Sequence, residues 1–359
     1  MISLGGKTMI AYLDSNIYID ADYVFDREEF LTLRDLMRKG KLEILYTIDT
    51  AGRVNEQIET DIRRATSTYN RYLRKYMGPF RKNENYGIQE ISADAAVDDI
   101  QADFRKLLAE EGMLQIPLDP VSADRLISDY YGGLPPFENK RSLGFRDAIA
   151  INALRNYACA KDLICVVSKD DEFRSAFEND KNFLPFSTLD SFIRFVQETQ
   201  DELVDLSDKL KEIIGEGQMN EGIEKYIYSM DIVRECEEDC LCRSTSIEDV
   251  DCYLAYIEEQ DDKLYAVINT MLYISAEVIY IDKDRSYYDE DKGEYLIENY
   301  RIEREYHEVP RKVRAVCICN EPVGERKTLR GYKIVHDKIN TVIDLTDETM
   351  YKSEEVKDQ

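Results

Sequence analysis

The sequence predicts an α/β domain with a central parallel sheet, followed by a smaller α+β domain with antiparallel strands. In the first two hundred residues, short apolar runs alternate with stretches of helical periodicity, which is typical of a parallel sheet with helices on both faces. Later runs are closely spaced, rich in tyrosine and separated by turns. A length of 359 residues, 43% of them hydrophobic, suits two domains with sizeable cores.

The first domain, residues 1–200, contains four expected strands and several helices. Residues 8–13 form a continuous apolar run that ends at Asp14, and residues 163–167 are rich in β-branched side chains. Ser187, with Asp190 three residues later, predicts the N-cap of the last helix. The strands expected are 8–13, 42–48, 163–167 and 183–186. The helices expected before residue 187 are 30–39, 50–76, 94–111, 122–131 and 146–160.

Residues 201–220 are expected to be a helical linker, because an acidic helical pattern there ends at Gly215 and Gly217. Residues 221–359 then form the α+β domain, whose role the sequence does not indicate. It could serve oligomerisation or the docking of a protein partner. The strands expected here are 253–258, 264–274, 277–281, 295–306, 312–319 and 332–335.

The net charge of −26 is unevenly distributed. Residues 1–200 carry 26 Lys and Arg against 33 Asp and Glu, a net charge of −7, whereas residues 201–359 carry 21 against 40, a net charge of −19. This balance argues against general coating of nucleic acid, although a local basic patch can still bind phosphates. The composition also excludes a disordered chain, a collagen and a disulfide-rich miniprotein.

The sequence favours a cytoplasmic protein that does not enter a membrane. Its first residues have neither a basic segment nor a long apolar segment of the kind found in secretory signals. The most apolar later stretch, residues 271–281, is too short to span a bilayer. Eight cysteines in such a chain are expected to be reduced thiols, and the spacing of Cys236, Cys240 and Cys242 does not repeat as in zinc sites.

Four acidic residues follow strands or begin helices at one edge of the expected sheet. Asp14 and Asp170 follow two strands directly, Asp147 begins the helix that leads into the strand 163–167, and Glu56 lies early in the helix after the second strand. Ligand sites in parallel sheets form at the carboxyl ends of strands. Four carboxylates there would repel each other, and hard divalent cations such as Mg²⁺ or Mn²⁺ relieve that repulsion through oxygen ligands.

These residues resemble the motifs of the PIN-domain nucleases. The string YLDSN at residues 12–16 is similar to the first motif of that family, in which Asp-Ser/Thr-Asn follows an apolar strand. GFRDAIA at residues 144–150 resembles the third acidic motif, and VVSKDDEF at residues 166–173 resembles the fourth. Glu56 stands where the family has its second acid. The resemblance covers residues 8–200 and implies a PIN-like three-layer α/β/α fold.

The resemblance also implies metal-dependent hydrolysis of phosphodiester bonds, usually in RNA. Asp14, Glu56, Asp147 and Asp170 would then hold one or two Mg²⁺ or Mn²⁺ ions, which activate water and stabilise the leaving oxygen. Glu56 has alternatives in Glu59 and Asp49, and Asp170 has an alternative in Asp171. The polar residues that would orient these acids are Asn16, Ser168 and Glu172.

Two groups of basic residues could bind a phosphate backbone. On the long helix of the first domain, Arg64, Arg71 and Lys75 can share a face, with Tyr69, Tyr72 and Tyr76 interleaved. Such a face suits phosphate contacts combined with base stacking, but it could equally be a solvated face with core tyrosines. The second group, which flanks Asp147, consists of Lys140, Arg141 and Arg146. We expect Lys140 or Arg141 to steer a nucleic-acid strand toward the acids.

The sequence therefore predicts a metal-dependent endoribonuclease that acts on single-stranded RNA, as a toxin-like or defence effector or in RNA processing. Two alternatives remain open. The same acids could cleave DNA, because a carboxylate–metal site does not itself distinguish the two sugars. The domain could also be a non-catalytic module that binds nucleic acid or protein on a PIN scaffold.

Overall fold

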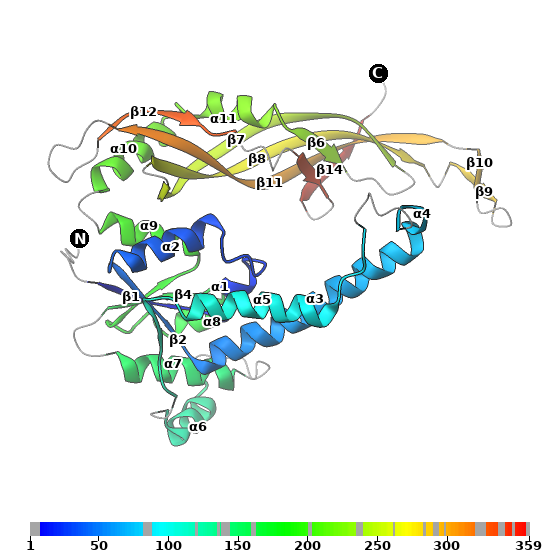
Figure 1. Ribbon diagram of the computed structural model, residues 1–359. Helices are drawn as coiled ribbons and strands as arrows, with labels where there is room; N and C mark the ends of the chain where they lie inside the picture. The colour runs from blue at the N-terminus through cyan, green and yellow to red at the C-terminus, as the bar shows by residue number, and fades with distance from the viewer. Residues whose placement is uncertain are drawn as a thin grey trace. The chain divides into compact units, whose positions relative to one another are not determined.

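The computed structural model divides the chain into two compact units, Met1–Thr199 (unit 1) and Gln200–Gln359 (unit 2), which are described separately below (Figure 1). The residues that the structure describes are 8–81, 88–118, 121–134, 137, 144–158, 163–199, 203–234, 240–260, 263–282, 285–289, 294–297, 299–319, 328–336, 342–346 and 349–356.

Unit 1 contains a five-stranded parallel sheet in the order β3-β2-β1-β4-β5. The strands are β1 (Met9–Leu13), β2 (Leu42–Tyr46), β3 (Met113–Gln115), β4 (Ile164–Val167) and β5 (Phe183–Phe186). Helices α2 and α9 lie on one face of this sheet and α7 on the other (Figure 1). The expected α/β/α layering around a parallel sheet is thus confirmed.

The described helices of unit 1 are α1 (Ser15–Ile19), α2 (Glu28–Arg38), α3 (Ile48–Tyr76), α4 (Gly78–Arg81), α5 (Ala93–Leu108), α6 (Ala123–Gly132), α7 (Phe145–Tyr157), α8 (Asp171–Ser175) and α9 (Leu189–Glu198). Six of them match the expected helices to within a few residues, whereas the short helices α1, α4 and α8 were not expected.

The N-cap of α9 and strand β3 also differ from what the sequence predicts. The N-cap of α9 is Thr188 rather than Ser187, because the Thr188 hydroxyl accepts a hydrogen bond from the Ser191 amide at 3.2 Å. Strand β3 was not expected at all. Its three residues are largely exposed and give no apolar run, so only pairing with β2 defines it.

The core of unit 1 fills both faces of the sheet. On the α7 side, Ile151 and Leu154 pack against Val166 of β4, and helices α2 and α9 bury Leu33 and Phe192. A separate aromatic cluster joins α1, α2 and α5, with ring centroids 5.4–6.4 Å apart. Its members are Tyr18, Phe25, Phe30 and Phe104. This packing fixes the helices that flank the carboxyl ends of the strands.

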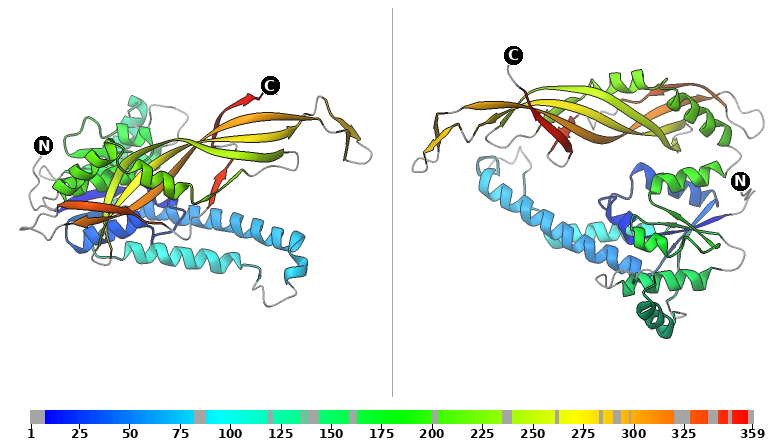
Figure 2. Two further views of the ribbon diagram at one scale, coloured as in Figure 1. Left: turned by 90° about the horizontal axis from the view of Figure 1, so that it is seen from above. Right: turned by 180° about the vertical axis from the view of Figure 1, so that it is seen from behind.

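Helix α3 begins at a well-capped N-terminus beside the sheet and then extends outward with α5 alongside it (Figures 1 and 2). The Thr47 hydroxyl accepts from the Thr50 amide at 3.0 Å, and the Thr50 hydroxyl also lies 2.9 Å from that of Tyr12 in β1. These buried contacts tie the first turn of α3 to the centre of the sheet. They therefore fix which α3 side chains reach the strand ends.

Unit 2 is built on long antiparallel strands in the order β12-β11-β8-β7, with β14 also pairing with β11. Helices α10 and α11 lie on one face of this sheet (Figure 2). The long strands are β7 (Cys240–Gln260), β8 (Lys263–Ile281) and β11 (Tyr300–Cys319). The other elements are α10 (Val204–Gly215), α11 (Asn220–Ile227), β6 (Asp231–Arg234), β9 (Tyr287–Asp289), β10 (Glu294–Ile297), β12 (Leu329–Ile334), β13 (Val342–Leu345) and β14 (Met350–Glu355).

Several expected strands of unit 2 are parts of longer ones. The expected strands 264–274 and 277–281 are both in β8, and most of 295–306 and all of 312–319 are in β11. Pro310 does not interrupt β11. It pairs with Met271 on one side and lies between the segments that β14 and β12 cover on the other, so its missing N–H leaves no ladder bond unmade. The helix expected in the linker, α10, packs into the core of unit 2.

No helix in the described ranges is both long and apolar enough to cross a membrane.

A buried polar cluster joins four segments of unit 2 around Glu305. Its carboxylate accepts from Arg234 Nε of β6 at 2.8 Å and from the Tyr280 hydroxyl of β8. His307, fully buried, lies 3.1 Å from the same carboxylate and 2.9 Å from the Thr349 hydroxyl. Burial by itself raises the pKa of Glu305, but the hydrogen bonds outweigh it and lower this pKa to about 2.

We expect Glu305→Gln to lower the free energy of unfolding of unit 2 by roughly 2–4 kcal/mol at neutral pH. The folded pKa of about 2 lies below the ordinary value of 4.5, so the ionised carboxylate stabilises the fold above pH 4.5. That contribution is lost as the pH falls from 4.5 toward 2, and the difference between wild type and variant should shrink there. Urea denaturation of both proteins at pH 7 and pH 3 measures this difference in the free energy of unfolding.

Glu221→Gln is the control, because it removes an exposed ion pair with Lys225 on α11 and should leave the stability unchanged. A pH-independent difference between wild type and Glu305→Gln would contradict the role of the buried charge.

Candidate functional site

The site lies where β1 and β4 end, at the point where the strand order of the parallel sheet changes direction. From β1 the chain continues to β2 and β3 on one side, and then returns to β4 and β5 on the other. The loops after β1 and β4 therefore diverge and leave a crevice at their carboxyl ends. Asp14 follows β1 directly, and Ser168 follows β4.

Asp14 is a buried carboxylate held by donors from three residues. One oxygen accepts from the Ser15 amide at 2.6 Å, and the other accepts from Asn16 Nδ2 at 2.8 Å and from Ser168 Oγ at 2.6 Å. Burial raises the pKa of Asp14, and the negative charge of Asp147 adds to this rise, while the hydrogen bonds oppose it. The structure thus places Asn16 and Ser168 in direct contact with Asp14.

Asp170 begins α8 on the other side of Ser168. Its carboxylate accepts from the Phe173 amide at 3.1 Å as the N-cap of α8, and its own amide donates to Ser168 Oγ at 3.1 Å. Ser168 is therefore shared between the two acids that end β1 and β4. Asp170 itself is exposed, and Glu172 is half-buried within α8.

Asp147 lies in the first turn of α7, where its side chain is 27% exposed. Burial raises its pKa, and the charges of Asp170 and Asp49 add to this rise. Arg53 of α3 opposes the shift through an ion pair at 2.5 Å from Nη2 to Asp147 Oδ1. The charge of Asp147 acts on Asp14 and that of Asp170 acts on Asp147, so neighbouring acids of this set lie within electrostatic range of each other.

Glu56 lies further out than the three aspartates. Its side chain is 73% exposed and pairs with Arg146 Nη1 at 3.5 Å. Arg146 also bonds Asp49 at 2.7 Å, and Asp49 in turn forms an ion pair with Arg53, with Oδ2 2.9 Å from Nε. Asp49, which the sequence offered as an alternative to Glu56, is thus connected through one guanidinium to Asp147.

The contribution of Asp49 and Arg53 to the site is not evident when the residues of the sequence are considered one at a time. Asp49 lies in the first turn of α3, only three residues after the end of β2, as expected for a residue at a strand's carboxyl end. Arg53 lies four residues later and forms a helical i,i+4 ion pair with it. The fold then brings Asp147 against the same guanidinium.

The chemistry of these side chains suits a hard divalent cation, since Asp14, Asp147 and Asp170 supply carboxylate oxygens at one edge. Among the residues that the structure describes, no three His, Cys, Asp or Glu side chains form a preassembled group for a metal ion. Arg53 lies against Asp147 in this arrangement. The three carboxylates are chemically suited to such an ion. In the described residues, the positive charge beside Asp147 is the guanidinium of Arg53.

One of the two groups of basic residues expected to bind nucleic acid lies along α3, and the other is the group near Asp147. Lys140 and Arg141 lie outside the described residues, and Arg146 pairs with Asp49 and Glu56. Residues 62–81 contain six Lys and Arg and no acid. Two of the six make close ion pairs with acids near α5, Arg63 with Asp94 and Arg74 with Glu90.

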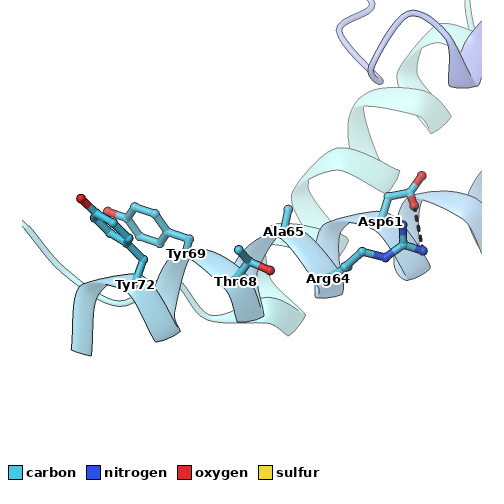
Figure 3. Close-up of a pocket in the computed structure, with 6 residues that line it drawn as sticks. All are labelled: Asp61, Arg64, Ala65, Thr68, Tyr69 and Tyr72. Atoms are coloured by element: carbon cyan, nitrogen blue, oxygen red, sulfur yellow. Dashed lines mark ion pairs between the residues drawn. The ribbon is translucent and has the colours of Figure 1, made fainter. Parts of the chain in front are cut away.

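One face of this part of α3 carries a shallow groove with Tyr69 and Tyr72 toward one end and Arg64, paired with Asp61, toward the other (Figure 3). Arg64 is 73% exposed and lies 3.8 Å from Asp61. The rings of Tyr72 and Tyr76 are 5.1 Å apart, and Lys75 Nζ lies 4.6 Å from the Tyr76 ring centroid. The residues that line the groove are Asp61, Arg64, Ala65, Thr68, Tyr69 and Tyr72.

The comparisons with known proteins agree with this geometry. The family model described as a PIN domain matches residues 11–173, from the middle of β1 to α8. No curated protein and no solved structure matches the chain significantly. PIN domains are generally nucleases that hydrolyse phosphodiester bonds, bind nucleic acids and typically use divalent metals. Residues 11–173 of this chain therefore match the PIN-domain family, and unit 2 is a separate part of the chain.

Proposed function

We propose that unit 1 is an endoribonuclease that hydrolyses phosphodiester bonds of single-stranded RNA with Mg²⁺ or Mn²⁺. The observation that carries this proposal is the buried Asp14 carboxylate, which donors from three residues hold at the crevice between β1 and β4. Burying a carboxylate costs free energy unless a cation or donors compensate it, so such a group is typical of a functional site.

Each acid has a distinct part in this proposal. Asp14 is the fixed ligand, because Ser168 and Asn16 hold both its position and its ionised form. Asp147 and Asp170 approach the same crevice from α7 and α8. Glu56 is the fourth acid and reaches the site from α3 only if its side chain leaves Arg146. A bound Mg²⁺ or Mn²⁺ would activate water and stabilise the leaving oxygen.

The choice of RNA rests on the family's usual substrate and on α3. Single-stranded RNA is bound through phosphates and stacked bases, and the outer part of α3 offers both cations and exposed tyrosines. Arg64, Arg71 and Lys75 would contact the phosphates. The strong negative charge of residues 201–359 makes unit 2 an unfavourable surface for a polyanion, so we place the binding of nucleic acid in unit 1.

We expect wild-type protein with Mn²⁺ to cleave labelled single-stranded RNA, and expect EDTA to abolish the cleavage. Asp147→Asn should lower kcat/KM by about 100-fold or more, because it removes a charge from the crevice. Asp103→Asn, in an exposed ion pair with Lys106 on α5, is the control and should cleave at the wild-type rate. Cleavage that persists in EDTA or in Asp147→Asn would contradict the mechanism.

The same assay on single-stranded DNA distinguishes a ribonuclease from a DNA nuclease. Preferential cleavage of DNA would support a DNA nuclease that uses the same acids. Binding of RNA with no cleavage of either strand would support a non-catalytic module.

Glu56→Gln should have a smaller effect than Asp147→Asn, with a loss of about tenfold in kcat/KM, because Glu56 is largely exposed and outside the three-aspartate group. Measuring both variants with Asp49→Asn under one set of conditions identifies the fourth acid. A wild-type rate for Glu56→Gln would remove Glu56 from the site. A loss as large as that of Asp147→Asn would mean that Glu56 contributes as much to catalysis as Asp147.

Replacing Arg71 and Lys75 together by Ala should weaken binding of single-stranded RNA by about tenfold or more at 100 mM salt. The slope of log affinity against log salt concentration should fall by about 1.4, since each phosphate contact on a single strand contributes about 0.7. Fluorescence anisotropy at several salt concentrations measures both quantities.

The matched control replaces Lys209 and Lys225 by Ala, which removes the same charge from the exposed helices of unit 2. An unchanged slope for the α3 variant, or an equal change for the control, would mean that α3 makes no phosphate contacts.

A further inference from the structure

Among the residues that the structure describes, Arg53 is the cation paired with Asp147 of the candidate site. Its guanidinium spans two carboxylates, with Nη2 2.5 Å from Asp147 Oδ1 and Nε 2.9 Å from Asp49 Oδ2. All three side chains are partly buried, with exposed fractions of 25% for Arg53, 27% for Asp147 and 20% for Asp49. Ion pairs sheltered to this degree are screened less than surface pairs.

The charge of Arg53 also acts on Asp14. Attraction between the two stabilises the ionised form of Asp14, while Asp147 and Asp14 repel each other. The guanidinium is therefore the group that compensates the negative charge of the site. A guanidinium supplies one positive charge spread over a plane, whereas a divalent ion supplies two at about 2.1 Å from each ligand oxygen.

The two cations cannot contact the same face of Asp147 together. The oxygen Oδ1 that faces Arg53 is the one already in the ion pair at 2.5 Å. A divalent ion beside Arg53 would also meet repulsion from a guanidinium that is locked between two acids. For the ion to bind Asp147 through Oδ1, the guanidinium has to leave that oxygen.

We propose that Arg53 is the resident counter-cation of the acidic site and that a divalent ion binds by displacing its guanidinium from Asp147. The proposal rests on the metal site of the proposed function. Asp49 is the group that retains Arg53 after the exchange, because it holds Nε from one helical turn away. The displaced guanidinium thus stays at the rim of the crevice.

The exchange limits how tightly the metal binds, because binding has to break the ion pair between Arg53 and Asp147. Removing the guanidinium while keeping an apolar side chain should leave the carboxylates uncompensated and more attractive to a cation. The chain offers a matched control in Arg63, ten residues further along α3. Arg63 also bridges two acids, Glu59 at 3.0 Å and Asp94 at 2.8 Å, but lies outside the site.

The test measures Mn²⁺ binding by isothermal titration calorimetry to full-length wild type, Arg53→Met and Arg63→Met, with no nucleic acid present. We expect Arg53→Met to bind Mn²⁺ at least about tenfold more tightly than wild type, and Arg63→Met to remain within about twofold. Thermal unfolding gives a second readout. Mn²⁺ should raise the Tm of Arg53→Met more than that of wild type, since ligand stabilisation follows affinity.

If Arg53→Met fails to fold, Arg53→Lys carries the test. Lysine keeps the charge but cannot bridge two carboxylates with a planar fork, so Mn²⁺ should bind about threefold more tightly than to wild type. Unchanged or weaker Mn²⁺ binding by a folded Arg53 variant, with measurable binding by wild type, would overturn the exchange and leave the metal site standing. Absence of Mn²⁺ binding in every protein would overturn the metal site and the exchange together.

Discussion

The cost of keeping several carboxylates in a partly buried crevice is the constraint on which the organisation of unit 1 depends. Parallel strands deliver Asp14 and Asp170 to one edge, and α7 brings Asp147 to the same edge. Desolvation and mutual repulsion raise the pKa values of Asp14 and Asp147. The neighbouring groups compensate this cost in two ways: neutral donors hold Asp14, and Arg53 holds Asp147.

The two kinds of compensation explain why some site residues could be predicted and others could not. Asp14, Asn16 and Ser168 lie directly at strand ends, where a short apolar run followed by polar residues is visible in the sequence. Arg53 meets Asp147 across 94 residues of sequence, and Arg146 meets Asp49 across 97. Such pairs depend on how α3 and α7 pack on the sheet, which periodicity within either helix does not reveal.

The same limit applies to the fold. The parallel sheet and its helices were predicted because four of the five strands, all except β3, are largely apolar runs that need cover on both faces. In unit 2 the breaks expected around Ser275 and Pro310 were wrong. Ser275 is buried opposite Tyr306 and its hydroxyl donates to Glu248, while Pro310 lies where β11 lacks a second paired strand. Neighbouring strands decide whether a polar residue or a proline ends a strand, and local sequence does not contain that information.

Helix α3 links the acidic crevice to the basic face because one rigid element carries both. Arg53 and Arg71 are eighteen residues apart, which corresponds to about 27 Å along the helix axis. A stacked strand that rises about 3.4 Å per nucleotide would need about eight nucleotides to contact both positions. A helix tied to β1 through Thr50 and Tyr12 keeps this separation constant. In the proposed function, the part of α3 beyond the sheet would therefore favour strands long enough to reach it, while the first turns would act on the acids.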